Sequence, residues 1–378
     1  MTKLLLLILV LIVAPAMAAM AQKERVPIVK DGAVTQYIYN KFSLNTYSLS
    51  FVILFLIVFI TKSGEDIPTY VQYYKLWSLN DLKSLDFEPG YKLLCIFLNS
   101  FISNPYIGIG IIKFFSLFLV YRAIYLLRDR INVGFSVFAY VTLLYIYSFH
   151  LLRMMLALSI VFLAYSYESM GKEKRCFLLL CIALLFHYSA IFALGAYLIY
   201  KFINSNLTIL KIISLLVVGS IALFSFNKFA EYAITKFSIF SKYDAYLKLE
   251  GGSGSGIMQI IWLLPILYII MRMYHTERFD KFYVLSVVCG IFTFYCGSLG
   301  YFAPVFSRSA YYFYFFFVMY CASLQLKPRS VQLVYGSKKV SFLTLFMIVY
   351  LIVRLFFNIH YDNILVSNGL DEYILFWD

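Results

Sequence analysis

Residues 150–190 read HLLRMMLALSIVFLAYSYESMGKEKRCFLLLCIALLFHYSA, two apolar segments joined by a short basic turn. Arg153 stands at the start of the first segment and His187 near the end of the second. Ionisable side chains at membrane depth are costly, so they generally face a protein interior or a water-filled cavity and take part in function. The path of this stretch therefore decides both the fold and the placement of two candidate functional groups.

The composition of the 378-residue chain is that of a membrane protein, with 62% hydrophobic and 13% charged residues. So few charged groups cannot cover the surface of a water-soluble globule of this size. The net charge of +13 comes from lysines and arginines in short loops, which favours cytoplasmic retention of those loops over a nucleic-acid partner. The predicted fold class is all-α, a polytopic integral membrane protein of about 10–12 transmembrane helices forming a single domain over residues 1–378.

The six cysteines lie in or beside apolar segments, with no CxxC spacing and no histidine partner nearby. Cysteines in such surroundings are usually small core-filling side chains, so neither a disulfide nor a metal site is predicted. The glycine-rich stretch 251–256 lacks the lysine of a phosphate-binding loop. We therefore expect no metal and no cofactor.

Apolar runs mark the membrane spans. The first, 2–20, ends like a secretory cleavage site, but the basic stretch that follows favours a retained helix with that stretch in the cytoplasm. The extracytoplasmic loops are predicted at 62–105 and 227–256, and Pro89 begins a helix of about a dozen residues in the first loop, too short to cross the membrane. The further spans are predicted at 46–61, 106–127, 132–149, 151–168, 208–226, 257–274, 282–299, 309–326 and 340–358.

The apolar stretch between Lys174 and Lys201 either crosses the membrane once or turns back on itself. A hairpin puts nine downstream basic residues in cytoplasmic loops and five outside, as the positive-inside rule prefers, whereas a single crossing inverts these numbers. The sequence therefore predicts a re-entrant hairpin of two short helices that meet near His187. The nine are Lys201, Lys211, Arg272, Arg278, Lys281, Lys327, Arg329, Lys338 and Lys339, and the five are Lys228, Lys236, Lys242, Lys248 and Arg308.

This topology places several polar residues on the extracytoplasmic side, where they are predicted to line one cavity. Each also has a simpler explanation: Glu88 as a helix cap, the two arginines as interfacial anchors and His187 as a core group. A shared side of the membrane favours a common site over separate coincidences. The residues are Asp66, Glu88, His150, Arg153, Arg308, His360 and, from within the membrane, His187.

Five sequence patches follow one another along the chain: GEDIPTYVQYY at 64–74, FEPGYKLL at 87–94, LLRMMLALSI at 151–160, LLFHYSAIF at 184–192 and SRSAYYF at 307–313. In these patches the chain resembles the EpsG family of polysaccharide polymerases, related to the Wzy-type O-antigen polymerases. Ile67 and Pro68 depart from the family pattern, in which an aromatic residue usually follows the aspartate.

The resemblance implies a multi-pass protein of the bacterial inner membrane that joins undecaprenyl-pyrophosphate-linked oligosaccharide repeat units at the outer face. A terminal sugar hydroxyl of one unit attacks the anomeric carbon of the growing chain and expels undecaprenyl pyrophosphate. The product would be O-antigen for lipopolysaccharide, capsule or exopolysaccharide. The implied partners are the lipid-linked oligosaccharide, the lipid bilayer and a chain-length regulator, with no nucleic acid.

For this chemistry Arg153 and Arg308 are the predicted pyrophosphate ligands, because a guanidinium stays charged and offers a planar fork of donors without a metal. His187 is the predicted general base, since imidazole titrates near neutral pH, and Glu88 is expected to orient the sugar or assist proton transfer. Further substrate contacts, with the tyrosines as platforms for sugar rings, are expected from Asp66, Tyr70, Tyr73, Tyr91 and His150.

Two other classes of function stay open. A membrane glycosyltransferase that uses a polyprenyl-phosphate sugar would also carry acidic residues in its first outer loop, here Glu65 and Asp66, and would add a single sugar. A transporter or flippase for lipid-linked sugars would need no acid-base pair and more often shows internal repeats with broken helices, which this sequence lacks.

Overall fold

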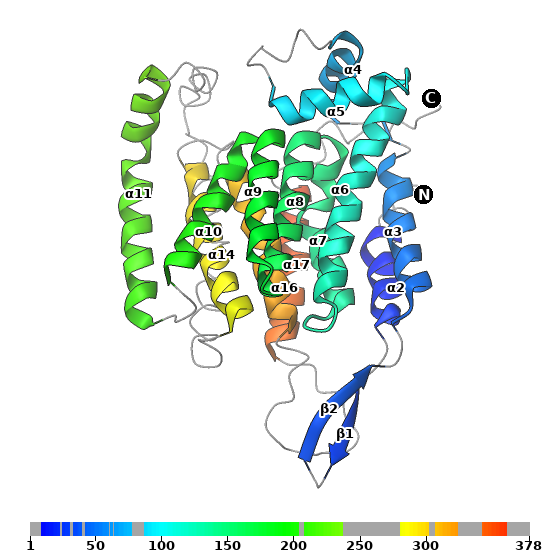
Figure 1. Cartoon of the computed structure of the whole chain (residues 1–378), viewed down its shortest axis with the longest axis vertical. Coiled ribbons are helices and arrows are strands. Elements are labelled where there is room, and N and C mark those ends of the chain that lie inside the picture. Colours follow the sequence, from blue (N-terminus) through cyan, green and yellow to red (C-terminus); the bar gives the residue numbers. More distant parts are fainter. Residues whose placement is uncertain are drawn as a thin grey trace. The chain divides into compact units, whose positions relative to one another are not determined.

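The computed structural model of the chain is helical apart from one two-stranded β-hairpin within the residues that it describes (Figure 1). The all-α fold class is confirmed. The span predicted at 257–274 lies outside the described residues. The structure describes residues 9–22, 25–30, 33–39, 42–59, 61–62, 64–77, 87–203, 208–236, 280–301, 307–323 and 342–360.

The chain divides into two compact units, which are described separately. Three helices begin in one unit and end in the other: α5 (Pro89–Asn99), α8 (Leu152–Ser169) and α16 (Tyr311–Ser323). The single domain over 1–378 and the extracytoplasmic cavity stay predictions. Unit 1 comprises Met1–Ser78, Leu94–Ser159 and Val318–Asp378, and unit 2 comprises Leu79–Leu93 and Ile160–Phe317.

Unit 1 packs its helices closely by means of small side chains. Ala14, Ala18 and Ala21 are fully buried, and a Cβ on Gly134 would lie 2.5 Å from the Ala19 side chain, so α2 and α7 approach closely. Its elements are the π-helical turn η1 (Leu9–Val13), α2 (Ala14–Ala21), β1 (Arg25–Lys30) paired antiparallel with β2 (Ala33–Tyr39), α3 (Leu44–Phe59), α4 (Ile67–Leu76), α6 (Pro105–Leu127), α7 (Val133–Leu143), the 3₁₀ turn η3 (Tyr145–Phe149) and α17 (Phe342–His360), with parts of α5, α8 and α16.

A lysine inside α6 shows how this apolar unit accommodates a charge. Lys113 is 3% exposed, and its ammonium donates a 3.1 Å hydrogen bond to the backbone carbonyl of Val58, in the last turn of α3. The last carbonyls of a helix lack partners within it, and a cation is favoured at that end. Lys113 therefore caps α3 from a neighbouring helix.

Unit 2 is built around aromatic side chains of α16. Phe315 lies 4.6 Å from Phe162 of α8 between ring centres, and Phe316 contacts Tyr165 of α8 and Phe282 of α14 edge-on. Figure 1 shows α9, α10 and α14 side by side. The elements of unit 2 are α9 (Glu173–Phe186), the 3₁₀ turn η4 (Tyr188–Ala190), α10 (Ile191–Ile203), α11 (Ile209–Lys236), α14 (Lys281–Ser298), and the 3₁₀ turns η6 (Leu299–Tyr301) and η7 (Arg308–Ala310), with parts of α5, α8 and α16.

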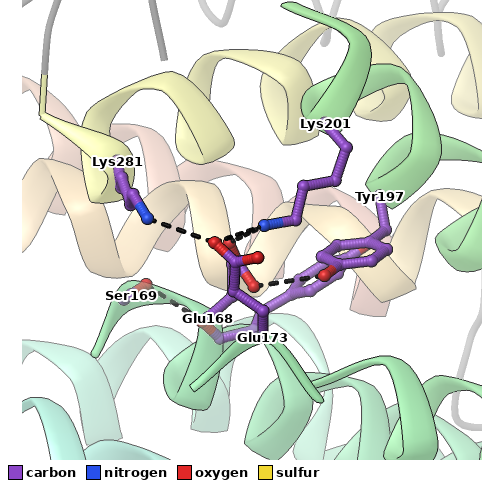
Figure 2. A network of polar contacts seen from close by, with 7 residues as sticks. Glu168, Ser169, Glu173, Tyr197, Lys201 and Lys281 are labelled. Carbon is purple, nitrogen blue, oxygen red and sulfur yellow. Dashed lines mark hydrogen bonds and ion pairs between the residues drawn. The ribbon is translucent and has the colours of Figure 1, made fainter. Parts of the chain in front are cut away.

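The predicted hairpin is present in unit 2. Helices α9 and α10 have 14 and 13 residues and are each about 20 Å long, short of the roughly 30 Å of a bilayer core. The chain turns back between them, because the Lys201 ammonium near the end of α10 lies 2.8 Å from the Glu173 carboxylate at the start of α9 (Figure 2). The two helices meet at His187, as the charge count predicts.

Every predicted span among the described residues coincides with a helix, in some cases with a short 3₁₀ or π-helical turn at one end. By length and composition, three described helices could cross a membrane unaided: α6, α14 and residues 209–226 of α11. In the loop predicted at 62–105, the short helix at Pro89 is confirmed as α5.

Helix also occurs in both segments predicted as loops, where the sequence did not indicate it. Helix α11 continues to Lys236, so the loop predicted at 227–256 begins as helix; 28 residues extend about 42 Å, more than a bilayer core requires. The polar loop at 62–105 also contains α4. There Asp66 occupies the N-cap position, Pro68 lies in the first turn, and Ile67, Tyr70 and Tyr74 form a buried stripe at helical spacing.

Candidate functional site

The break in the hairpin of unit 2 is made by His187. Its backbone is extended, with φ −158° and ψ 121°, whereas Tyr188 begins the 3₁₀ turn η4. Its N–H still donates to the Ala183 carbonyl of α9, and its own carbonyl accepts the Ala190 N–H, both at 3.0 Å. The imidazole is therefore held at the tip of the hairpin, where neither helix continues.

Glu88 approaches this tip from the start of α5. Its carbonyl accepts the Lys92 N–H in the first turn of that helix at 3.2 Å. One carboxylate oxygen, Oε1, lies 2.9 Å from Nδ1 of His187 and accepts the backbone N–H of Tyr188 at 3.3 Å. Glu88 thus precedes a helix, and its carboxylate contacts the candidate base.

The EPGY sequence explains this close approach. Pro89 is the first residue of α5, a position where its missing N–H costs no hydrogen bond. A Cβ on Gly90 would lie 2.7 Å from the carbonyl oxygen of Leu185 and 2.8 Å from that residue's Cβ. Real Cβ atoms do not approach so closely, so only glycine lets the start of α5 reach the last turn of α9.

The Glu88 carboxylate is enclosed by protein and the His187 imidazole is partly exposed, which is the arrangement that a general base supported by a carboxylate requires. The Glu88 side chain is 1% exposed and the His187 side chain 20% exposed. When the neutral imidazole donates its Nδ1–H to Glu88, Nε2 is the basic nitrogen. A buried carboxylate in this position orients the ring and stabilises the imidazolium that forms when Nε2 takes a proton.

A second contact joins the hairpin tip to α16. Ser189 Oγ and the Tyr312 hydroxyl are hydrogen-bonded at 3.0 Å, and Tyr312 is fully buried. Arg308 lies one helical turn before Tyr312, in η7, which packs against α14, and is half-buried, whereas Ser309 and Ala310 beside it are buried. Within unit 2 the structure therefore brings Glu88, His187 and the helix start that carries Arg308 to one end of the unit.

Unit 1 holds the second arginine together with α4. Arg153, in the first turn of α8, places Nε 3.4 Å from the Tyr70 hydroxyl, and its guanidinium carbon lies 6.0 Å from the centre of that ring. This is a long hydrogen bond at the outer limit of a cation–π contact. Tyr70 is 5% exposed, so it holds Arg153 from a buried position.

His150 is buried against the loop that precedes α4. It is 1% exposed, and a Cβ on Gly64 would lie 2.7 Å from the His150 Cβ. Gly64 also has φ +131°, a conformation that other residues rarely adopt. The first residue of the GEDIPTYVQYY patch is thus a glycine for two reasons, its backbone angle and its contact with His150.

The remaining predicted substrate contacts differ in accessibility. Asp66 is half-buried at the N-cap position of α4 and does not cap that helix with its side chain. Tyr91 is 1% exposed, and like Tyr70 its ring is enclosed by protein. Tyr73 is half-buried and stacks on Trp77 with ring centres 5.1 Å apart, so among the three predicted platforms it offers the most accessible ring.

Sequence reasoning missed Ser189 and Tyr312 as members of the site. Both lie inside the HYSA and SRSAYYF patches, which was the signal that could have identified them. Lys92, one turn after Glu88 on α5, is fully buried. Among the described residues, no group of three or more His, Cys, Asp or Glu side chains is placed to hold a metal ion.

The model of the EpsG family matches residues 44–374, a range that contains α3 to α17 and every residue of the site. No curated protein and no solved structure matches the chain. Since the match covers most of the sequence, the chain belongs to the EpsG family of membrane proteins, which resemble the Wzy-type O-antigen polymerases.

Proposed function

We propose that the chain is a polysaccharide polymerase that joins undecaprenyl-pyrophosphate-linked oligosaccharide repeat units at the outer face of the bacterial inner membrane. The observation that carries the proposal is the 2.9 Å contact between Glu88 Oε1 and His187 Nδ1 at the hairpin tip. Membership of the EpsG family supports the class of reaction.

In the proposed step, Nε2 of His187 removes the proton of a terminal sugar hydroxyl on one repeat unit. The hydroxyl oxygen forms a bond to the anomeric carbon of the growing chain, and the bond from that carbon to the pyrophosphate oxygen breaks. Undecaprenyl pyrophosphate leaves with the bonding electrons. The Glu88 carboxylate stabilises the imidazolium, because it accepts a hydrogen bond from the nitrogen opposite the reacting one.

The arginines are assigned to the leaving group. Pyrophosphate gains negative charge as the glycosidic bond breaks, and a guanidinium offers a charged planar fork that matches phosphate oxygens. Arg308, one turn before Tyr312, which holds the hairpin tip, is the candidate within unit 2. Arg153 is proposed as the second ligand because the charge count places it on the same side of the membrane.

The Glu88–His187 pair also separates this proposal from transport. Moving a lipid-linked sugar across a bilayer breaks no covalent bond, so a flippase needs no base held by a buried carboxylate. A glycosyltransferase that uses a polyprenyl-phosphate sugar would need a base as well, and it differs in its product, a single added sugar. The product of the reaction therefore distinguishes the three classes.

The test is a reaction of the detergent-purified protein with purified lipid-linked repeat units, analysed by gel electrophoresis of the products. A ladder of increasing chain length supports polymerisation, whereas a single addition or no product overturns it. His187→Ala should abolish the ladder. Glu231→Gln, a change of an exposed carboxylate on α11, serves as the control and should leave the ladder unchanged.

A further inference from the structure

The end of the hairpin opposite His187 is held by a cluster of charged residues, shown in Figure 2. The Lys201 ammonium, in the last turn of α10, lies 2.8 Å from Glu168 of α8 and 2.8 Å from Glu173 of α9. Glu168 also accepts a 3.3 Å hydrogen bond from the Tyr197 hydroxyl. Glu173 is joined at 3.2 Å to Lys281 of α14. We call these five residues the foot cluster.

The two lysines of the foot cluster differ in their surroundings. Glu168 is fully buried, and Lys201 is 31% exposed, so their ion pair is partly shielded from water. Lys281 and Glu173 are 46% and 48% exposed, and a pair of this kind contributes little to stability. Lys201 thus makes the stronger connection through Glu168, and it joins three helices where Lys281 joins two.

The charge state of the cluster favours this connection. Hydrogen bonds from Lys201, and then from Lys281, hold the pKa of Glu173 below its usual range, so this carboxylate is ionised at neutral pH. Glu173 also occupies the first position of α9, where a negative charge is favoured by the helix dipole. The negative charge that Lys201 binds at the start of α9 is therefore present at neutral pH.

We propose that Lys201 is a positioning residue for His187: by holding the end of α10 against the start of α9 at the foot, it sets the place of the imidazole at the tip. The proposal rests on the proposed function and deepens it. Helices α9 and α10 are short rods joined at the break, and at the tip they are held by hydrogen bonds to Glu88 and Tyr312. A hairpin released at its foot can pivot, and such a pivot changes the distance between Nε2 and the sugar hydroxyl.

The experiment compares variants by kcat and KM, measured per amount of folded protein. In Lys201→Met we expect kcat to fall about 10-fold or more with KM nearly unchanged, because small misplacements of a reacting group are costly to the rate. Lys201→Arg should retain most activity, since a guanidinium can reach both carboxylates. Lys281→Met is the matched control, and its kcat and KM should be close to those of the unaltered protein.

A double variant separates positioning from simple charge neutralisation. Lys201→Met leaves the buried Glu168 charge without its ammonium partner and can impair folding for that reason alone. Lys201→Met with Glu168→Gln removes both charges, so the protein should fold, but kcat should remain low because the bridge from α10 to α8 and α9 is still missing. Full recovery of kcat in the double variant would overturn the positioning role.

A measurement of the tip itself does not depend on catalysis. Ile191 is exposed at the start of α10, and Cys181 is the one natural cysteine that is not buried. In a Cys181→Ser background, maleimide labelling of Ile191→Cys should change in rate about threefold when Lys201→Met with Glu168→Gln is added, and much less with Lys281→Met. Equal rates in all three would overturn the proposal, whereas failure of the unaltered protein to make a ladder would overturn the proposed function alone.

Discussion

Glu88 and His187 are 99 positions apart in the chain, and Oε1 of one lies 2.9 Å from Nδ1 of the other. The carboxylate is enclosed by protein and the imidazole is partly exposed. Each group reaches this place because a helix begins or ends there: α5 starts after Glu88, and α9 stops before His187. The pair is thus a product of two helix termini, and the predictions below test how it is held and used.

Replacing Glu88 by glutamine tests the charge of the carboxylate. The amide keeps the shape of the side chain and can still accept a hydrogen bond, but it cannot stabilise an imidazolium as a carboxylate does. We expect kcat to fall about 10²- to 10⁴-fold while the protein accumulates normally, as for loss of the charge behind a catalytic histidine. Product ladders from a time course measure this, and undiminished rates would show that Glu88 acts only as a structural partner.

Gly90→Ala tests the close approach of α5 to α9. The added methyl group would lie 2.7 Å from the Leu185 carbonyl oxygen, so α5 must move and take Glu88 with it. We expect a loss of about 1–3 kcal/mol in the free energy of unfolding, typical of overpacking, and a fall of about 10²-fold in activity.

Gly195→Ala, on α10, is the matched control for that change. A Cβ at Gly195 meets nothing within 4 Å, and alanine is the better helix former. The variant should be as stable as the unaltered protein or more stable by about 0.5–1 kcal/mol, with full activity. If both alanine variants behave alike in thermal unfolding and polymerisation, the close contact at Gly90 has no functional importance.

Arg153→Lys tests the guanidinium assigned to the pyrophosphate. Lysine keeps the positive charge but replaces the planar fork by a single ammonium, so we expect activity to fall about 10- to 100-fold through loss of a charge-assisted hydrogen bond. The amount of protein in the membrane should not change. Arg122→Lys, at an exposed arginine over the Tyr125 ring, is the control. Chains of normal length at a normal rate in Arg153→Lys would remove this residue from the leaving-group site.

Gln22→Met tests the connection between α2 and the turn that joins α6 to α7. The Gln22 side chain donates to the carbonyls of Arg128 and Ile131 at 2.7 and 2.8 Å, and it accepts the Val133 N–H at 2.8 Å. Methionine fills similar space but leaves these groups without their partner, so thermal unfolding should show a loss of about 1–3 kcal/mol. Gln22→Glu, which presents an acceptor to two carbonyls, should be at least as destabilising.

The sequence predicts those structural features that depend only on residues near one another in the chain. The short helix after Glu88 follows from Pro89, whose ring suits a first helical turn. Helix α4 was not predicted because its polar residues and Pro68 are typical of a loop. Its stripe of Ile67, Tyr70 and Tyr74 is recognisable as a buried helix face only in the folded unit 1, where these side chains are covered.

The sequence by itself determined that the chain is an all-α membrane protein and that the stretch between Lys174 and Lys201 turns back near His187. Both follow from quantities that add along the chain: hydropathy sets where helices form, and the count of basic residues sets on which side loops lie. Only the tertiary structure decided that Glu88 meets His187, that Tyr312 holds Ser189 and that Lys201 joins Glu168 to Glu173. Such contacts depend on the rotation of each helix about its axis. Helices α9 and α16 have almost no amphipathic asymmetry, so no polar face in their sequences specifies that rotation.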